Sequence, residues 1–281
     1  MRNKMAYMGD PHKAKQRWMK KKKIEEVKAD LAAGKSLYKN AEEFWNNEYA
    51  ENETGGVSQG DKFTLSGEAS ADLQKFIRWI ERQYKGQQVF GPRSFVVDAG
   101  CGNGRNLLWM CENFGVNGLG YDISEEGTKS ASRKLKVLGG SEHVKFMTRN
   151  LNESIPVEDN KADLVIDAIA SHVLRKEERE KYKQEVLRVL STGSYYFLKS
   201  LLLDEDAHAK KMIRDYGANA GEENSYIHPT MGIFEHVPSE EELVNFYKDD
   251  FEIEKIERSH AHQVRGRANK RRYIVLYLRK K

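Results

Sequence analysis

Short apolar segments alternate with amphipathic ones through the middle of this 281-residue chain. Residues 95–99 are apolar apart from Asp98, and such a run is long enough for a buried strand but too short for a helix. Residues 162–169 are nearly all apolar, which is typical of a parallel strand covered on both faces. The same reasoning predicts further strands at 116–121, 144–147, 195–198, 251–257 and 273–278.

Helical periodicity fills the gaps between these strands. Leu73, Phe76, Ile77 and Ile80 recur at helical spacing and predict a helix over 70–84, ahead of the first strand. Similar patterns predict helices at 106–114, 125–138 and 175–190. Strands alternating with helices favour an α/β fold with a doubly wound, mostly parallel sheet, here of seven strands.

The two ends of the chain differ from this middle part. Residues 1–35 carry a dense basic run at 20–23 followed by helically spaced apolar residues, which predicts a basic helical N-terminal extension. We expect one further domain over 36–281. Within it we predict an aromatic helix at 36–53, a turn at 54–60, a core at 70–200, an insert at about 204–250 and a strand pair at 251–281.

The insert has a less regular pattern. It predicts a polar helix over 204–216, a loop over 217–232 and a helix from Ser239 to about residue 248. A very basic segment from Arg258 to Arg272 then links the last two predicted strands.

Composition adds little to this pattern. The formal net charge is only +4, but basic residues gather at both ends of the chain. Cys101 and Cys111 are the only cysteines, so no disulfide framework is predicted. No apolar run approaches the roughly 18 residues that a membrane span needs. We therefore expect a reducing, cytoplasmic setting and no membrane partner.

Three glycines at alternate positions follow the first strand. Gly100, Gly102 and Gly104 can adopt backbone angles closed to other residues, and the helix after them presents free N–H groups to a ligand. This arrangement predicts a nucleotide or nucleoside site. No Gly-Lys-Ser/Thr follows, which excludes a triphosphate loop. Asp98 would repel a pyrophosphate but can accept hydrogen bonds from an ammonium group.

Several motifs in order resemble the class I S-adenosylmethionine-dependent methyltransferases, in their generic methyltransferase-domain branch. Residues 97–104 (VDAGCGNG) are similar to that family's first motif, and residues 120–124 (GYDIS) to its second. Residues 150–165 and 172–174 resemble the later motifs. The resemblance covers about residues 70–200, and it implies a Rossmann-like fold and S-adenosylmethionine as the methyl donor.

The resemblance also implies which residues hold the donor. Asp98, Gly100, Cys101, Gly102 and Asn103 would hold its methionine part. Asp122 would bind the ribose, Ile123 would pack on the adenine, Asn150 would meet the adenine amino group and Leu151 would give a backbone contact. Asn150 stands where the family more often has an acid. Asp167 is a further candidate for the donor loop.

The acceptor side is less well defined. Asp167 and His172 are the candidate catalytic residues, because both follow the fourth strand and can titrate. The favoured acceptor is a small molecule under a lid built from the aromatic helix and from residues Tyr226, His228, Phe234, Glu235 and His236. The alternatives are an RNA methyltransferase that uses the basic N-terminal arm and the segment from Arg258 to Arg272, and a non-catalytic cofactor-binding subunit. We expect no metal, because the histidines lack close ligand pairing.

Overall fold

The computed structural model describes residues 22, 25, 38–53, 67–139, 142–229, 231–260 and 271–281. The predicted extension at 1–35, the predicted turn at 54–60 and the middle of the basic segment, residues 261–270, lie outside the described residues apart from Lys22 and Glu25. The division into 1–35 and 36–281 stays a prediction. Within the described parts, none of the helices has the length and apolar character that a membrane crossing requires.

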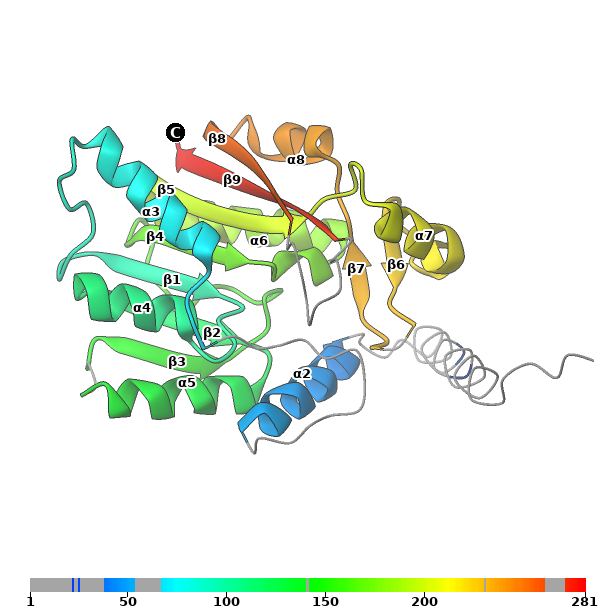
Figure 1. The fold of residues 1–281 in the computed structure, drawn as a ribbon, viewed down its shortest axis with the longest axis horizontal. Helices are drawn as coiled ribbons and strands as arrows, with labels where there is room; N and C mark the ends of the chain where they lie inside the picture. Colours follow the sequence, from blue (N-terminus) through cyan, green and yellow to red (C-terminus); the bar gives the residue numbers. More distant parts are fainter. Residues whose placement is uncertain are drawn as a thin grey trace, which may run out of the picture.

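A seven-stranded sheet forms the centre of the molecule, in the order β3-β2-β1-β4-β5-β9-β8 (Figure 1). The first five strands run parallel, and β9 lies antiparallel between β5 and β8. The predicted fold class is therefore confirmed. The strands of this sheet are β1 (Phe95–Ala99), β2 (Asn117–Asp122), β3 (Val144–Thr148), β4 (Ala162–Ala168), β5 (Leu190–Leu201), β8 (Phe251–His260) and β9 (Arg272–Lys280).

Helices cover both faces of the sheet and enclose two apolar cores. One core packs α3 (Ala71–Gln83), α4 (Arg105–Phe114) and part of α5 (Glu125–Val137) against the sheet. The other packs α6 (Lys176–Val189) and α8 (Glu240–Tyr247) against the opposite face. Burial on both faces explains why the central strands are so uniformly apolar. The carboxyl ends of the parallel strands are left free for loops.

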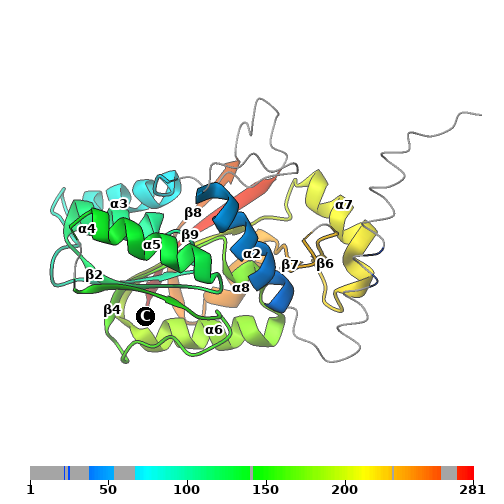
Figure 2. The same ribbon diagram turned by 90° about the horizontal axis from the view of Figure 1, so that it is seen from below.

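The remaining elements gather at these carboxyl ends. They are α2 (Tyr38–Glu53), the short turn η1 (Ser171–Val173), α7 (Ala207–Tyr216), η2 (Gly217–Asn219), β6 (Ser225–Ile227) and β7 (Phe234–His236). Figure 2 shows α2 lying across the end of the sheet, between α5 and the β6–β7 pair. Ala41, Phe44 and Trp45 of α2 pack with Met231 and Ile233 of the insert. The N-terminal helix and the insert therefore close over the same edge.

The structure differs from the sequence predictions most clearly at β5, at α7 and at β6. β5 begins at Leu190 instead of 195, because Leu190 pairs with Ala162 before the register shifts. α7 begins at Ala207 instead of 204, because the Asp206 carboxylate caps it by accepting a hydrogen bond from the Ala209 N–H at 2.7 Å. The predicted loop over 217–232 contains β6, which pairs with β7 in a small separate sheet. Three-residue strands are too short to leave a periodic signal.

Candidate active site

The glycine loop lies at the carboxyl end of β1, as predicted. Gly100 has a φ of 71°, in the left-handed region that favours glycine. A Cβ on Gly100 would lie 2.3 Å from the Cβ of Ala170, which follows β4. The loop therefore packs so closely against the neighbouring chain that Gly100 cannot be replaced without a shift.

Asp98 is a fully buried carboxylate directly before this loop. Its Oδ2 accepts a hydrogen bond from the Leu107 N–H at 3.3 Å, and its Oδ1 has no partner among the described residues. Burial raises the pKa of Asp98 to about 7. An unpaired buried carboxylate oxygen is costly, and the ammonium of an amino-acid ligand would satisfy it. The residue therefore fits the predicted methionine end of the donor.

Asp122 ends β2, next to β1 in the sheet. Its Oδ2 accepts from the Gly102 N–H at 2.9 Å, and its Oδ1 accepts from the Ser124 N–H at 2.8 Å. Burial raises the pKa of Asp122. Each carboxylate oxygen still has acceptor capacity for a ribose hydroxyl. The same carboxylate therefore fixes the glycine loop and could bind a sugar.

The other predicted donor residues lie around these two acids. Cys101 is buried, and burial raises the pKa of its thiol, so it stays protonated and is a poor nucleophile. The Asn103 carbonyl accepts a hydrogen bond from Lys134 at 3.4 Å. Ile123 packs in the cluster that joins α2 to the insert, and Leu151 belongs to the core beneath α6. Asn150 Oδ1 accepts from the Asn152 N–H at 3.2 Å, so its amide already stabilises the local turn.

α2 contributes two site residues that the sequence did not single out as ligands. A Cβ on Gly102 would lie 1.9 Å from the Tyr49 hydroxyl, so this phenol lies directly on the glycine loop. Burial raises the pKa of Tyr49, and the nearby Asp122 raises it further. Asn46 Oδ1 accepts from the Ser124 hydroxyl at 2.8 Å and from the Glu126 N–H at 3.2 Å. The aromatic spacing predicted a helix over a pocket but not these contacts.

Asp167 and His172, the candidate catalytic residues, lie on either side of the η1 turn. The Asp167 carboxylate accepts from the Ala170 N–H at 2.9 Å, the Ser171 N–H at 3.3 Å and the Tyr196 hydroxyl at 3.3 Å. Burial raises its pKa. Asp167 therefore holds the turn that carries Ala170 against Gly100. Its predicted roles toward donor and acceptor stay predictions.

His172 is partly buried beside the insert. Its Nδ1 has no hydrogen-bond partner among the described residues. Burial lowers the pKa of His172 to about 4, although the neighbouring Glu235 opposes that shift. The imidazole is therefore neutral at neutral pH, and it can accept a hydrogen bond but is a weak base.

Glu235 belongs to a buried polar cluster on the β6–β7 pair. Its carboxylate accepts a short hydrogen bond from the Tyr226 hydroxyl, which in turn accepts from Arg271 at 3.0 Å. Burial would raise the pKa of Glu235, but His172 and Arg271 lower it overall. The sequence placed Tyr226 and Glu235 in the lid, and it did not predict Arg271 as their partner.

The described ends of the basic segment are tied to the chain. Arg258 pairs with Glu240 at 2.7 Å, and the Arg272 N–H donates to Asp206 at 2.8 Å. Residues 261–270, which carry three of the segment's six Lys and Arg residues, lie outside the described residues. No group of three or more His, Cys, Asp or Glu side chains suited to a metal occurs in the described ranges.

Known proteins resemble this chain over the region that contains the glycine loop. Residues 96–193 match the model of a methyltransferase domain. A sarcosine/dimethylglycine N-methyltransferase of Halorhodospira halochloris is 24% identical over 171 residues, 59% of this chain and 60% of that protein. A norajmaline N-methyltransferase of Rauvolfia serpentina is 27% identical over 146 residues, 50% of this chain and 47% of that protein. The chain thus spans less than two thirds of the length of either curated relative.

Two solved structures share the fold. A SAM-dependent methyltransferase of Methanosarcina mazei has a TM-score of 0.61 and 21% identity, and the match covers 76% of this chain and 98% of that one. A geranyl diphosphate C-methyltransferase of Streptomyces coelicolor, solved with S-adenosyl-L-homocysteine, has a TM-score of 0.57 and 15% identity over 88% and 98% of the chains. The domain match shows a methyltransferase domain over residues 96–193, and the seven-stranded sheet has the Rossmann-like fold that these solved structures share.

Proposed function

We propose that this chain is an S-adenosylmethionine-dependent methyltransferase acting on a small molecule, and that the acceptor atom is an amine nitrogen. The observation that carries the proposal is the unpaired Oδ1 of buried Asp98, beside a glycine loop and next to Asp122. Both curated relatives are N-methyltransferases by name, which supports nitrogen as the acceptor atom. A reducing compartment such as the cytoplasm fits the two free thiols.

The donor-side residues have distinct tasks in this proposal. Bound S-adenosylmethionine supplies a methyl group already activated on a sulfonium. Asp98 accepts hydrogen bonds from the ammonium of the amino-acid part, and Asp122 accepts from the ribose hydroxyls. Tyr49 and Asn46 hold α2 against the loop, which excludes water from the donor. These residues bind and orient the methyl donor, and the alignment of donor and acceptor is most of what methyl transfer needs.

The acceptor-side residues position the nucleophile. An amine needs a free lone pair but no strong base, because it can lose its proton to water before methyl transfer. His172 is suited to accept a hydrogen bond from the amine N–H, since its lowered pKa keeps it neutral. Asp167 positions His172 through the η1 turn.

Calorimetry with S-adenosylhomocysteine tests the donor half of the proposal. We expect binding by the unmodified chain and at least about tenfold weaker binding by Asp122→Ala, because two backbone N–H groups and the sugar lose an acceptor. The Glu125→Ala variant, three residues along and on the surface of α5, is the control and should bind normally. Unchanged affinity in Asp122→Ala would contradict the assigned site. Methyl transfer to a panel of amines, alcohols and thiols then tests the acceptor atom.

A further inference from the structure

A cavity of about 1190 Å³ lies between α6, η1 and the insert. Ser171 and His172 of η1 line it, as do Leu198 and Ser200 near the carboxyl end of β5. Ligands of open α/β sheets bind outside the carboxyl ends of the strands. The cavity therefore reaches the strand ends at which an acceptor would meet the donor.

The walls of this cavity combine aromatic rings with acidic side chains. The apolar part comes from α6, β5 and α8, namely from Tyr182, Leu198, Leu243, Phe246 and Tyr247. Carboxylates outnumber cations among the lining residues. The acids on α6 and the insert include Glu177, Glu180, Glu185, Glu222, Glu223 and Glu242. The cations are Lys176, Arg179 and Lys181.

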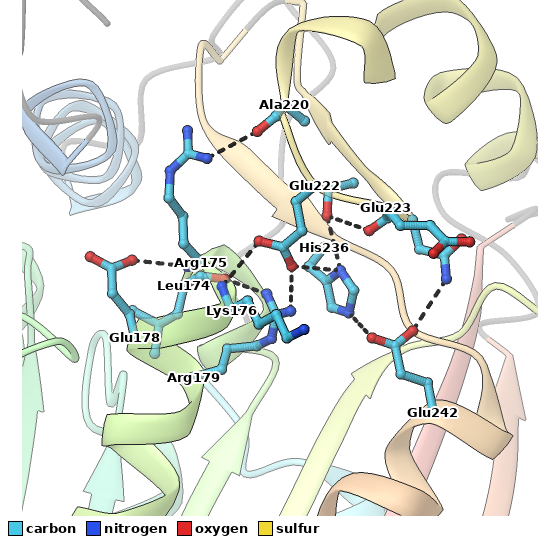
Figure 3. Close-up of polar contacts among 12 residues, drawn as sticks. Leu174, Arg175, Lys176, Glu178, Arg179, Ala220, Glu222, Glu223, His236 and Glu242 are labelled. Atoms are coloured by element: carbon cyan, nitrogen blue, oxygen red, sulfur yellow. Dashed lines mark hydrogen bonds and ion pairs between the residues drawn. The ribbon is translucent and has the colours of Figure 1, made fainter.

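The most buried of these cations is already neutralised. Figure 3 shows Arg179 pointing at Glu222, and the two form a short ion pair. Glu222 also accepts from the Lys176 N–H at 3.0 Å and lies 3.5 Å from His236, whose Nε2 lies 2.8 Å from Glu242 (Figure 3).

Lys176 and Lys181 are exposed to solvent, as are Glu177, Glu180 and Glu223. Among the lining acids, Glu180 pairs with Lys183 and Glu185 pairs with Arg188. Glu177, Glu223 and Glu242 have no Lys or Arg partner among the described residues, which leaves these three carboxylates on the cavity wall against the two exposed lysines.

Two buried acceptor atoms on the cavity walls have no partner among the described residues. They are the hydroxyl oxygen of Tyr182, a residue only 2% exposed, and Nδ1 of His172. Buried polar atoms are nearly always hydrogen-bonded in folded proteins. An N–H group of a bound molecule could donate to either atom.

We propose that this cavity binds the methyl acceptor, and that the acceptor is an ammonium cation carried on an apolar body. Carboxylates attract the cation, aromatic rings favour ammonium groups, and the apolar wall buries the rest of the molecule. The inference rests on the proposed function, because it names the acceptor class of the same enzyme.

The reaction balances with this acceptor. The bound ammonium loses one proton to water through the open side of the cavity, and the freed lone pair forms the new N–C bond. The S–C bond of the methyl donor breaks, and its electron pair stays on sulfur, which becomes a neutral thioether. No oxidant or further reactant is needed.

Binding of benzyltrimethylammonium to the full chain loaded with S-adenosylhomocysteine tests the inference. This probe carries the charge and an apolar ring but cannot be methylated. We expect it to bind at least about tenfold more tightly than its neutral carbon analogue, neopentylbenzene. Equal affinity for the two compounds would overturn the assignment of an ammonium site.

Two pairs of matched variants locate the probe. Glu242→Gln should weaken binding about fivefold, whereas Glu240→Gln, on the same helix turn but paired with Arg258, should change it less than about twofold. Phe246→Leu should also weaken binding. Phe114→Leu is its control, because Phe114 also makes an edge-to-face ring pair near the end of a helix, on the opposite face of the sheet. Melting temperatures exclude variants that fail to fold.

The outcomes separate this inference from the proposed function. If S-adenosylhomocysteine binds and amines are methylated while the cavity variants leave probe affinity unchanged, the cavity assignment is wrong and the enzyme assignment stands. If S-adenosylhomocysteine does not bind, the proposed function fails, and the ammonium probe still tests the cavity in the unloaded protein.

Discussion

The proposed donor side and the proposed acceptor side of this protein are built in different ways. The donor side uses backbone N–H groups and carboxylates close together in the chain, such as Gly102 and Asp122. The acceptor side uses side chains from separate elements, such as Arg179 with Glu222 and His236 with Glu242. A donor site made from the main chain tolerates little change, whereas an acceptor site made from side chains can vary on a constant fold.

α2 contacts both sides. Asn46 binds the turn after β2, and Phe44 and Trp45 pack with the insert. The Tyr38 hydroxyl donates a short hydrogen bond to Glu178 of α6. The helix therefore connects the donor loop with the acceptor lid. For this reason a variant made on either side should also be measured for its affinity for S-adenosylhomocysteine.

The largest effect is expected from Gly100→Ala. Gly139→Ala is the matched control, because its φ is also left-handed, at 94°, but a Cβ there meets nothing within 4 Å. Both variants bear a backbone cost of about 1–2 kcal/mol, and only Gly100→Ala adds the collision with Ala170. We expect calorimetry to show S-adenosylhomocysteine affinity falling more than about 100-fold in Gly100→Ala and staying unchanged in Gly139→Ala. Equal affinities would mean that the loop does not need this close approach.

The next effect is a pH dependence that belongs to the donor side alone. Asp98 has a pKa of about 7 without ligand, and an ammonium ligand holds it ionised. Donor affinity should therefore rise about tenfold from about pH 6 to about pH 8 and then level off, with one proton released per ligand at the acid end. Calorimetry in two buffers of different ionisation enthalpy measures that proton. A flat profile, or the same profile in Asp98→Asn, would contradict the role of Asp98.

Asp98 also makes folding stability depend on pH, and here the effect of rising pH is a decrease. Its folded-state pKa is raised, so the folded chain keeps a proton that the unfolded chain has released between about pH 4 and about pH 7. The free energy of unfolding of the ligand-free protein should therefore fall as the pH rises from about 4 to about 7. Saturating S-adenosylhomocysteine should remove most of the fall, because it stabilises the ionised carboxylate. Urea unfolding at several pH values, with and without ligand, measures both slopes.

The sequence predicted the position of the glycine loop and of the two strand ends well, because their determinants are local. Glycine spacing and an acid at each strand end are readable in one short segment, and Asp98 and Asp122 lie where the motifs put them. The contacts of Tyr49 with Gly102 and of Arg271 with Tyr226 join residues far apart in the chain. No periodicity or motif encodes such pairs. For the same reason the three-residue strand β6, which depends on tertiary packing, was predicted as part of a loop, and its partner β7 was not predicted as a strand.

A smaller effect should be confined to the acceptor side. Glu222→Ala removes the ion-pair partner of Arg179 and the acceptor at the start of α6, and it leaves a largely buried guanidinium with the Leu174 carbonyl but no carboxylate partner. We expect a loss of about 1–3 kcal/mol of unfolding free energy, together with an acceptor KM raised about fivefold. S-adenosylhomocysteine affinity should stay unchanged. Weaker donor binding would mean that the insert also supports the donor loop, and the contrast between the two sides would fail.

The smallest effect tests whether Asn150 belongs to the donor side at all. If its amide oxygen accepts from the adenine amino group, Asn150→Asp should strengthen S-adenosylhomocysteine binding about two- to threefold, because a carboxylate is the better acceptor. Asn150→Ala should weaken it by a similar factor. If the side chain only accepts from the Asn152 N–H and stabilises the turn, both variants should bind normally and Asn150→Ala should only melt earlier. Calorimetry and melting curves on the two variants together decide between these roles, since a turn cap changes stability and an adenine ligand changes affinity.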